Sequence, residues 1–352
     1  MKGTEKLVTL KEIAQTCGVS ITTVSNVLNG KLKVSEETRQ RVFEVLKQTG
    51  YQPNYFAQGM RKQKTRIIGI IVEDLDLFST PPIVEAIMAY CDDNNYRTIL
   101  VNMRLYDKWQ DTWYSDEKKI QSVLQPTLQE LLSIKVDGIM YVAGHCRDIN
   151  SFREDFNIPA IIVYALSTSS RYPSVVIDDE MGSYDITKYL ISKGHRKIGV
   201  IAGIANNLHT QKRGLGYQRA LFEEQILFNP DWIKHGDWKR MSGYIQAEKL
   251  VKEGVTAIFC MNDLMAAGAY DYLYENNITV GQDISIVGYD NNEISEYLRP
   301  RLTTNDIPLK KIGKTAAEYF INLLEDGLYS NESQVVIKLP CNIVIRESVG
   351  SI

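Results

Sequence analysis

The 352-residue sequence lacks a long uninterrupted hydrophobic run, and it begins with the polar residues Met-Lys-Gly-Thr-Glu-Lys. A membrane-spanning helix needs about 20 predominantly apolar residues, and a secretory signal needs an apolar core, so the sequence predicts neither. We therefore expect a cytoplasmic protein without a membrane partner.

Cysteine and histidine are scarce, with five and four residues respectively, and they are scattered without a C-x-x-C pair or an H-E-x-x-H motif. This spacing favours free thiols over disulfides and predicts no metal site. A nucleophile elbow, a G-x-G-x-x-G loop and a phosphate-binding P-loop are also missing. We expect no cofactor, no metal and no enzymatic activity.

Charge is distributed unevenly along the chain. Residues 1–66 contain 12 Lys and Arg against 5 Glu, a net charge of +7, whereas the whole chain carries −3 and the remainder therefore −10. A basic segment on an acidic body indicates that only the N-terminal part meets a polyanion. A basic face that is simply solvated would give the same charges, so further signals are needed.

The N-terminal segment has the spacing of a helix-turn-helix. Thr9 and Glu12 form a capping box that predicts a first helix of about two turns. Gly18 can supply the positive φ that a tight corner needs, and Ser20 can cap a second helix. That helix and a third one over 35–49 each carry an apolar stripe that would pack inward.

The outward face of the second helix carries short polar side chains and one apolar tip. In a major groove, Asn can pair with adenine and an apolar group can touch the thymine methyl, although the same face also suits solvent. The residues on this face are Ile21, Thr22, Ser25, Asn26 and Asn29.

From residue 67 onward, hydrophobic strands alternate with helices rich in Ala and Leu. Near-continuous apolar runs predict strands that are covered on both faces, and hence an α/β body of parallel sheets. Ligands of such sheets gather beyond the carboxyl ends of the strands, so two facing lobes would form a cleft. One set of strands is expected over 67–72, 97–101, 138–142 and 160–163, and a second over 174–177, 197–201, 257–260 and 284–288.

Motifs along nearly the whole chain resemble the LacI/GalR family of bacterial transcription regulators. They include V-T-L-K-E-I-A from Val8, T-V-S-N-V-L-N from Thr23, S-V-V-I-D-D from Ser174, M-N-D-L-M-A-A-G from Met261 and D-I-S-I-V-G-Y-D from Asp283. The resemblance implies an all-α helix-turn-helix head and a two-lobed body similar to periplasmic sugar-binding proteins. We expect a head over 1–50, a hinge over 51–66, a first lobe over 67–165 and 309–335, and a second lobe over 166–308 and 336–352.

The resemblance also implies which residues contact DNA. Asn26 stands where many members carry Arg, which favours adenine over guanine at the facing base. Met60 takes the place of a Leu wedge in a hinge helix that forms over the minor groove, with a flexible linker as the alternative. The expected contacts come from Thr9, Ser20, Ile21, Thr22, Ser25, Asn26, Asn29, Tyr51, Asn54, Ala57, Met60 and Arg61.

By position, three residues match those that hold effector hydroxyls in sugar-responsive members. The Arg213 guanidinium can donate several hydrogen bonds, the Asp290 carboxylate can accept them, and the Asn262 amide can do both. In the alternative roles, Asn262 only caps a helix and Asp290 only accepts from a loop amide. Trp238 matches an aromatic residue that lies against a sugar ring, with packing inside the lobe as its alternative role. In the first lobe, the positions expected to line the cleft are Glu73, Phe78 and Tyr164. These residues differ from those at the matching positions of the lactose repressor.

Relative to the family, the chain carries about ten inserted residues over 105–114, which could close over a bound sugar or only decorate the rim. The overall prediction is a homodimeric repressor of a carbohydrate operon that a sugar releases from a palindromic operator. The expected sugar is galactose-like or an oligosaccharide. A corepressor-type or phosphoprotein-assisted regulator is the alternative within the same class. A sugar-binding transport protein and a sugar-processing enzyme are the alternatives from other classes.

Overall fold

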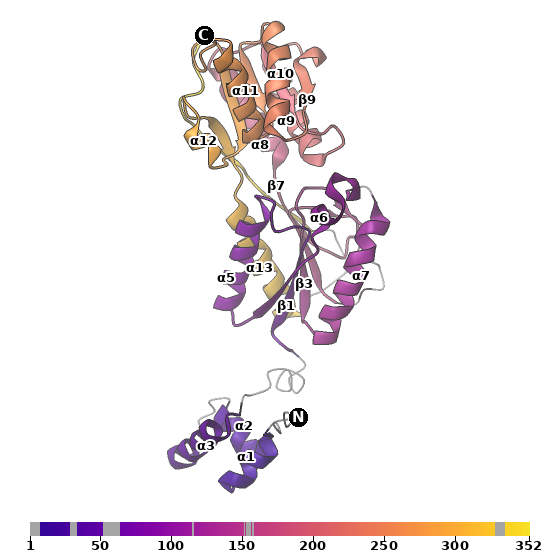
Figure 1. Ribbon diagram of the computed structural model, residues 1–352, viewed down its shortest axis with the longest axis vertical. Helices are drawn as coiled ribbons and strands as arrows, with labels where there is room; N and C mark the ends of the chain where they lie inside the picture. The colour runs from indigo at the N-terminus through magenta and orange to yellow at the C-terminus, as the bar shows by residue number, and fades with distance from the viewer. Residues whose placement is uncertain are drawn as a thin grey trace, which may run out of the picture. The chain divides into compact units, whose positions relative to one another are not determined.

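The computed structural model describes residues 8–28, 34–51, 64–114, 116–150, 152, 156, 158–327 and 335–352. The chain divides into two compact units, Met1–Thr65 and Arg66–Ile352. The first is the head, and the second is a body with two sheets (Figure 1). This mixed architecture confirms the predicted fold class.

The described residues of the head form three helices, and the predicted caps begin and end them. Thr9 and Glu12 form the capping box of the first helix, and Gly18 ends it with a φ of 63°. Ser20 accepts a hydrogen bond from the Thr23 N–H at the start of the second helix. The small head core comes from all three helices and includes Ile13, Val24 and Val42. The helices are α1 (Leu10–Cys17), α2 (Ile21–Leu28) and α3 (Glu36–Thr49).

The first lobe of the body is a parallel six-stranded sheet between two layers of helices. Helices α5 and α13 pack against each other on one face of the sheet, and α7 lies on the other face (Figure 1). In spatial order the strands are β13 (Val336–Leu339), β7 (Ser174–Ile177), β5 (Ala160–Val163), β3 (Gly138–Val142), β1 (Ile67–Val72) and β2 (Arg97–Asn102). The helices are α5 (Thr80–Asp93), α7 (Glu117–Ile134) and α13 (Leu309–Asp326), and β4 (Asp148–Ile149) pairs with β6 (Leu166–Ser167) beside them.

The second lobe repeats this plan, with one antiparallel strand at its edge. Helix α8 packs on α9 and α10 packs on α11. In spatial order the strands are β14 (Asn342–Val344), β12 (Thr303–Asp306), β11 (Ser285–Asp290), β10 (Ala257–Cys260), β8 (Ile198–Ala202) and β9 (Ile233–His235). The helices are α8 (Asp179–Ser192), α9 (Leu208–Glu223), α10 (Arg240–Lys252), α11 (Asp263–Glu275) and the short α12 (Ile294–Tyr297), and η2 (Pro230–Trp232) precedes β9.

The lobe boundaries differ from the expected ones at 166 and 336. Strand β7, expected in the second lobe, pairs with β5 and β13 in the first, and β13 also belongs to the first sheet. The chain therefore crosses between lobes after β7, after β12 and after β13. An apolar strand has the same composition in either sheet, so only pairing decides its lobe.

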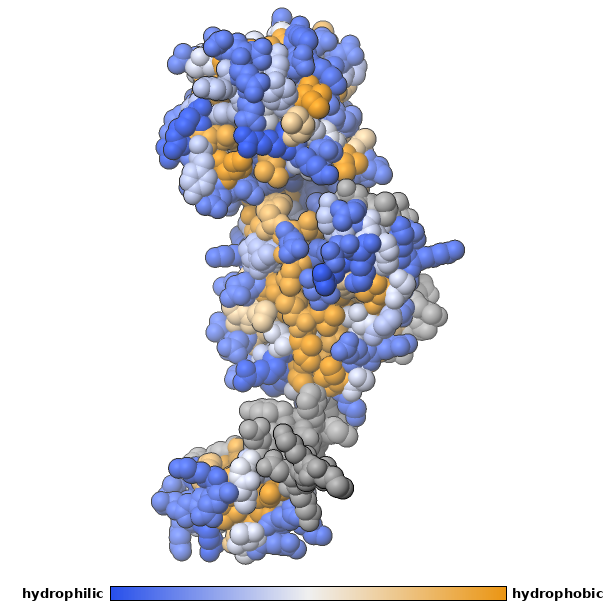
Figure 2. Space-filling model, viewed as in Figure 1, coloured by the Kyte–Doolittle hydropathy of each residue, from blue (hydrophilic) through white to orange (hydrophobic). Residues whose placement is uncertain are grey.

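One edge of the first sheet is an apolar strand that is only partly covered. Strand β2 pairs on one side with β1, and its residues Ile99, Leu100 and Val101 are half-buried. Hydrophobic residues gather on this lobe between α5 and α7 in the space-filling view (Figure 2). An apolar edge of this kind is a surface that proteins normally cover.

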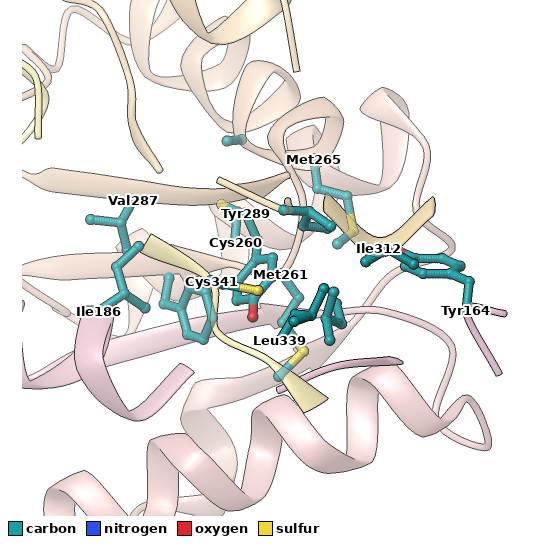
Figure 3. Close-up of a cluster of buried hydrophobic side chains, with 14 of the residues drawn as sticks. Tyr164, Ile186, Cys260, Met261, Met265, Val287, Tyr289, Ile312, Leu339 and Cys341 are labelled. Atoms are coloured by element: carbon teal, nitrogen blue, oxygen red, sulfur yellow. The ribbon is translucent and has the colours of Figure 1, made fainter. Parts of the chain in front are cut away.

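The cores of the two lobes meet where the chain crosses between them. One cluster of buried apolar side chains includes Leu339 and Ile312 from the first lobe and Met261 and Tyr289 from the second (Figure 3). Tyr164, at the end of β5, lies at the same junction (Figure 3). The polar groups that face the junction are therefore held by packed elements on both sides.

The inserted segment is not an open loop. It forms α6 (Leu105–Trp109) and the 3-10 turn η1 (Gln110–Trp113). Leu105 and Trp113 are fully buried in the first-lobe core that α7 also lines. Among the residues that the structure describes, none of the helices has the length and apolar character that a bilayer crossing requires.

Candidate functional sites

The outward face of α2 is the candidate DNA-reading surface of the head. Ile21 is 40% exposed, and Thr22 is exposed beside it. Ser25 and Asn26 lie on the same helix and are half-buried. The structure thus brings these four predicted residues together on one helix, where short side chains can approach base edges.

Three other predicted contacts have defined local roles in the head. The Thr9 hydroxyl accepts a hydrogen bond from the Glu12 N–H, and the Thr9 N–H donates to the Glu12 carboxylate at 2.7 Å. Ser20 caps α2, and Tyr51 packs on the head core. The remaining predicted contacts lie outside the described residues, namely Asn29, Asn54, Ala57, Met60 and Arg61.

The candidate ligand site lies at the carboxyl ends of the body strands. In the first lobe, Glu73 follows β1 and Tyr164 follows β5. In the second lobe, Asn262 follows β10 and Asp290 ends β11. Parallel strands place such residues along one edge of each sheet, which is the usual ligand-binding edge.

Glu73 is the centre of a buried polar cluster in the first lobe. Its carboxylate accepts hydrogen bonds from the Tyr141 hydroxyl at 2.7 Å and the Gly144 N–H at 2.8 Å. Arg147 Nη2 lies 2.5 Å from the same carboxylate. Burial and the Glu73 charge raise the pKa of Tyr141. Because all three partners belong to the protein, the predicted ligand residue Glu73 acts here as the counter-ion of Arg147.

Arg213 is the centre of the corresponding cluster in the second lobe. Its Nε donates to Asp179 at 2.7 Å, Nη1 donates to the Met261 carbonyl, and its guanidinium lies 3.6 Å from the Tyr289 ring centroid. Burial opposes ionisation of Asp179, but His209 and Arg213 outweigh it and lower the pKa of Asp179. The Arg213 charge is therefore neutralised and its orientation is held from several sides.

Asp290 is a half-buried carboxylate of this lobe that lacks a close partner among the described residues. Its oxygen lies 3.9 Å from Arg213 Nη1, beyond hydrogen-bonding distance. Burial raises the pKa of Asp290 well above its ordinary value, although Arg213 partly offsets this effect. The backbone at Asp290 has a φ of 113°, a conformation that non-glycine residues rarely adopt. Such strain at a strand end is typical of a ligand-contacting position.

Asn262 and Trp238 are coupled to each other beside Arg213. The Asn262 side chain accepts from the Met265 N–H at 2.8 Å, which caps α11, and donates to the Trp238 carbonyl at 2.9 Å. Trp238 has a φ of 70° and packs on Gly203, where a Cβ atom would lie 2.0 Å from the indole ring. Asn262 thus has the capping role that was its simpler interpretation, and it also fixes the Trp238 loop.

One direct hydrogen bond links the polar groups of the two lobes. The Cys146 N–H, in the loop after β3, donates to His209 Nε2 on α9 at 3.0 Å. Nδ1 of the same ring lies 2.8 Å from Asp179, so it is the nitrogen that carries the hydrogen. The Tyr164 and His209 rings lie 5.4 Å apart. This junction brings the first-lobe and second-lobe clusters into one site.

The sequence did not predict four residues of this site, namely Asp179, His209, His145 and Arg147. It did predict Phe78, which lies outside the two clusters. Asp179 and His209 carry signals that were available, since Asp179 ends the V-I-D-D motif and His209 precedes Arg213 by one helical turn. His145 and Arg147 had none, because their loop carries no recognisable motif. Phe78 lies before α5 and is 44% exposed.

Metal and thiol chemistry find no support in the described part of the chain. No group of three or more His, Cys, Asp or Glu side chains there could hold a metal ion. All five cysteines are buried free thiols, as expected from their spacing.

A helix-turn-helix head on a two-lobed body with polar clusters where the lobes meet defines a DNA-binding regulator that responds to a small molecule. The bacterial regulatory protein lacI family model matches residues 9–54, and a periplasmic binding protein-like domain matches residues 187–349. The chain belongs to the lacI family.

Curated relatives and solved structures match over nearly the full length. The transcriptional repressor PurR of Vibrio parahaemolyticus is 31% identical, over 97% of this chain and 99% of that protein. The ribose operon repressor of Haemophilus influenzae is 31% identical, over 98% and 100%. The crystal structure of the lac repressor dimer bound to operator and the anti-inducer ONPF has a TM-score of 0.79 at 28% identity, and the match covers 97% of this chain and 99% of that one.

Proposed function

We propose that this protein is a homodimeric repressor that binds a palindromic operator through its head and is released when a carbohydrate binds between the lobes. The observation that carries the ligand part is the pairing of Arg213 with Asp290 beside Trp238 at the strand ends. The Arg213 guanidinium and the Asp290 carboxylate suit the vicinal hydroxyls of a sugar, and the Trp238 indole suits the apolar face of its ring. The ribose operon repressor and the PurR repressors among its relatives support the regulatory role.

The DNA part of the proposal rests on the head. Its predicted contacts on α2 are solvent-accessible, and residues 1–66 carry a net charge of +7. A basic head positions itself on phosphates, and the short side chains of α2 then read base edges. This function places the protein in the cytoplasm, where its operator lies.

The dimer part rests on the uncovered edge of the first sheet. The half-buried residues Ile99, Leu100 and Val101 of β2 fit a second copy of the same chain, and the lac repressor, which shares this fold, is a dimer in its crystal structure with operator. Paired heads are needed to read two half-sites of a palindrome one helical turn apart. Sedimentation of the free protein at micromolar concentration is expected to give a dimer, and a monomer at that concentration would contradict this part.

The test of the ligand site is Asp290→Asn. The variant keeps the volume of the side chain and removes its charge, so operator binding is expected to remain within about threefold of the unaltered protein. Loss of a charge-assisted hydrogen bond should raise the sugar concentration needed for release by roughly 10- to 100-fold. Gel-shift titrations with galactose, ribose, lactose and cellobiose measure both quantities.

Asp231→Asn is the matched control, because Asp231 is exposed on η2, which precedes β9 and so lies at the opposite end of the strands from the site. Unchanged release of Asp290→Asn would show that the site is misplaced. Tighter operator binding in the presence of sugar would replace release with corepression.

A further inference from the structure

The inserted segment places an aromatic residue against a charged residue of the cleft. The Arg147 guanidinium carbon lies 4.8 Å from the centroid of the fully buried Trp113 ring. The neighbouring Tyr114 ring lies 5.5 Å from the ring of His145. The insertion therefore supports the loop after β3 through a cation–π contact with Arg147 and an edge-to-face contact with His145, instead of projecting from the rim as a lid.

Arg147 has a terminal nitrogen that the described residues leave without a hydrogen-bond partner. Nη2 is held by Glu73 at 2.5 Å and by the Tyr141 hydroxyl at 3.5 Å. Nη1 is buried and has no hydrogen-bond partner among the described residues. A buried donor without a partner is costly, and such groups are normally satisfied by a ligand or an ordered water.

The position of Arg147 makes a ligand the better partner. The preceding residue, Cys146, donates its N–H to His209 of the second lobe, so this loop faces the junction of the lobes. Arg147 belongs to the first lobe, whereas Arg213 and Asp290 belong to the second. A ligand held by the second lobe would therefore present its far end to Arg147.

Each of the two arginines at the junction is already paired with a carboxylate. Glu73 pairs with Arg147 at 2.5 Å, and Asp179 pairs with Arg213 at 2.7 Å. His145 is neutral at physiological pH, because burial and the nearby His209, Arg147 and Arg213 lower its pKa to about 3. A negatively charged ligand would add repulsion from Glu73 and Asp179 without finding an unpaired cation among these groups.

We propose that Arg147 is a specificity-determining residue that donates Nη1 to an uncharged oxygen of the effector, with Glu73 and Trp113 as its positioning residues. This inference rests on the proposed function and narrows its effector to a neutral carbohydrate. Sugar acids and sugar phosphates are excluded, because Glu73 cancels the charge that would attract them.

The test compares neutral and acidic sugars by thermal shift and isothermal titration calorimetry on the full chain. The neutral probes are galactose, ribose, lactose and cellobiose, and the acidic probes are galacturonate and ribose 5-phosphate. The unaltered protein is expected to bind a neutral probe at least 10-fold more tightly than its acidic counterpart.

Three variants separate recognition from folding. Arg147→Gln should weaken binding of the neutral probe roughly 10- to 100-fold, but it also leaves Glu73 buried without a partner. The double variant Glu73→Gln/Arg147→Gln removes both charges and should show the same weakening with a restored melting temperature. Glu73→Gln alone frees the Arg147 charge and should improve binding of the acidic probe at least 10-fold, a reversal that a purely structural role would not produce. Arg240→Gln, in an exposed ion pair with Asp271, is the control.

The outcomes are distinct. Normal binding of a neutral probe by the double variant, or a preference of the unaltered protein for an acidic probe, overturns the role of Arg147 and leaves the repressor proposal intact. If none of the probes shifts the melting temperature, the carbohydrate assignment fails, and the Arg147 inference fails with it.

Discussion

At the scale of single residues, the cleft is a set of buried charges that neutralise one another. Arg213 with Asp179 and Arg147 with Glu73 are close pairs, whereas Asp290 has only a 3.9 Å contact with Arg213. Removing one partner of a buried pair typically costs about 3–5 kcal/mol, because the other charge stays buried. Substitutions that test binding must therefore preserve charge balance, which is why Asp290→Asn is more informative than Arg213→Ala.

His145 makes the stability of the body depend on pH. Its pKa is lowered to about 3 in the folded protein, so the folded state takes up fewer protons than the unfolded state below about pH 6.5. The stability that the folded protein gains by keeping His145 neutral is fully present above about pH 6.5. It is lost as the pH falls toward 3, because the unfolded state takes up the proton first. Between pH 6.5 and 5, the unfolding free energy of the unaltered protein is expected to fall further than that of His145→Gln. The extra loss should be at most roughly 2 kcal/mol.

Denaturant melts of both proteins at pH 8, 6.5 and 5 measure this difference. Parallel curves across the three pH values would contradict a neutral His145 in the folded protein.

At the scale of elements, caps define the head and crossover strands define the body. Each described head helix begins at a Thr or Ser whose hydroxyl accepts a backbone N–H, and two of them end at a glycine with positive φ. These short helices have a small core, so the capping hydrogen bonds are a considerable part of their stability.

Thr9 combines a cap with a predicted DNA contact, and its two roles can be separated. Thr9→Ala removes the hydroxyl that accepts the Glu12 N–H and should destabilise α1 by about 1 kcal/mol. Thr9→Ser keeps that hydroxyl and is expected to behave like the unaltered protein. Hydrogen exchange of the α1 amides in the full chain should accelerate roughly fivefold in Thr9→Ala only. Equal acceleration in both variants would argue against the capping box.

At the scale of the whole molecule, a basic head is attached to an acidic body. The net charge is +7 over residues 1–66 and −10 over the remainder, so the body repels the phosphates that the head attracts. Binding of DNA and binding of the effector should therefore respond differently to ionic strength.

Operator affinity is expected to fall by roughly 10³- to 10⁵-fold between 50 and 200 mM salt, the range for a dimer that makes 6–10 phosphate contacts. Affinity for a neutral sugar should change less than about twofold over the same range, because the cleft charges are buried and paired. Fluorescence anisotropy with operator and calorimetry with sugar provide the two curves. A flat DNA curve would contradict binding through phosphates.

Local signals in the sequence predicted most of the helices and strands that build the site. Apolar runs located β1, β3, β5 and β10 with their observed bounds, because a buried strand must be apolar along its whole length. Helix α9 begins at Leu208 with a largely polar first turn, Leu-His-Thr-Gln, which no apolar run marks in the sequence. The inserted segment was interpreted as a surface loop, although Trp113 lies in the core.

By itself, the sequence determined the helix caps, the apolar strands, the basic head and the family, because each of these is written in neighbouring residues. Only the tertiary structure decided which lobe receives β7 and β13 and which charged side chains are paired within each lobe. Glu73 and Arg147 lie far apart in the chain, as do Asp179 and Arg213. Whether a charged side chain meets a ligand or a counter-ion depends on what the fold brings within about 3 Å of it, and no local pattern records that distance.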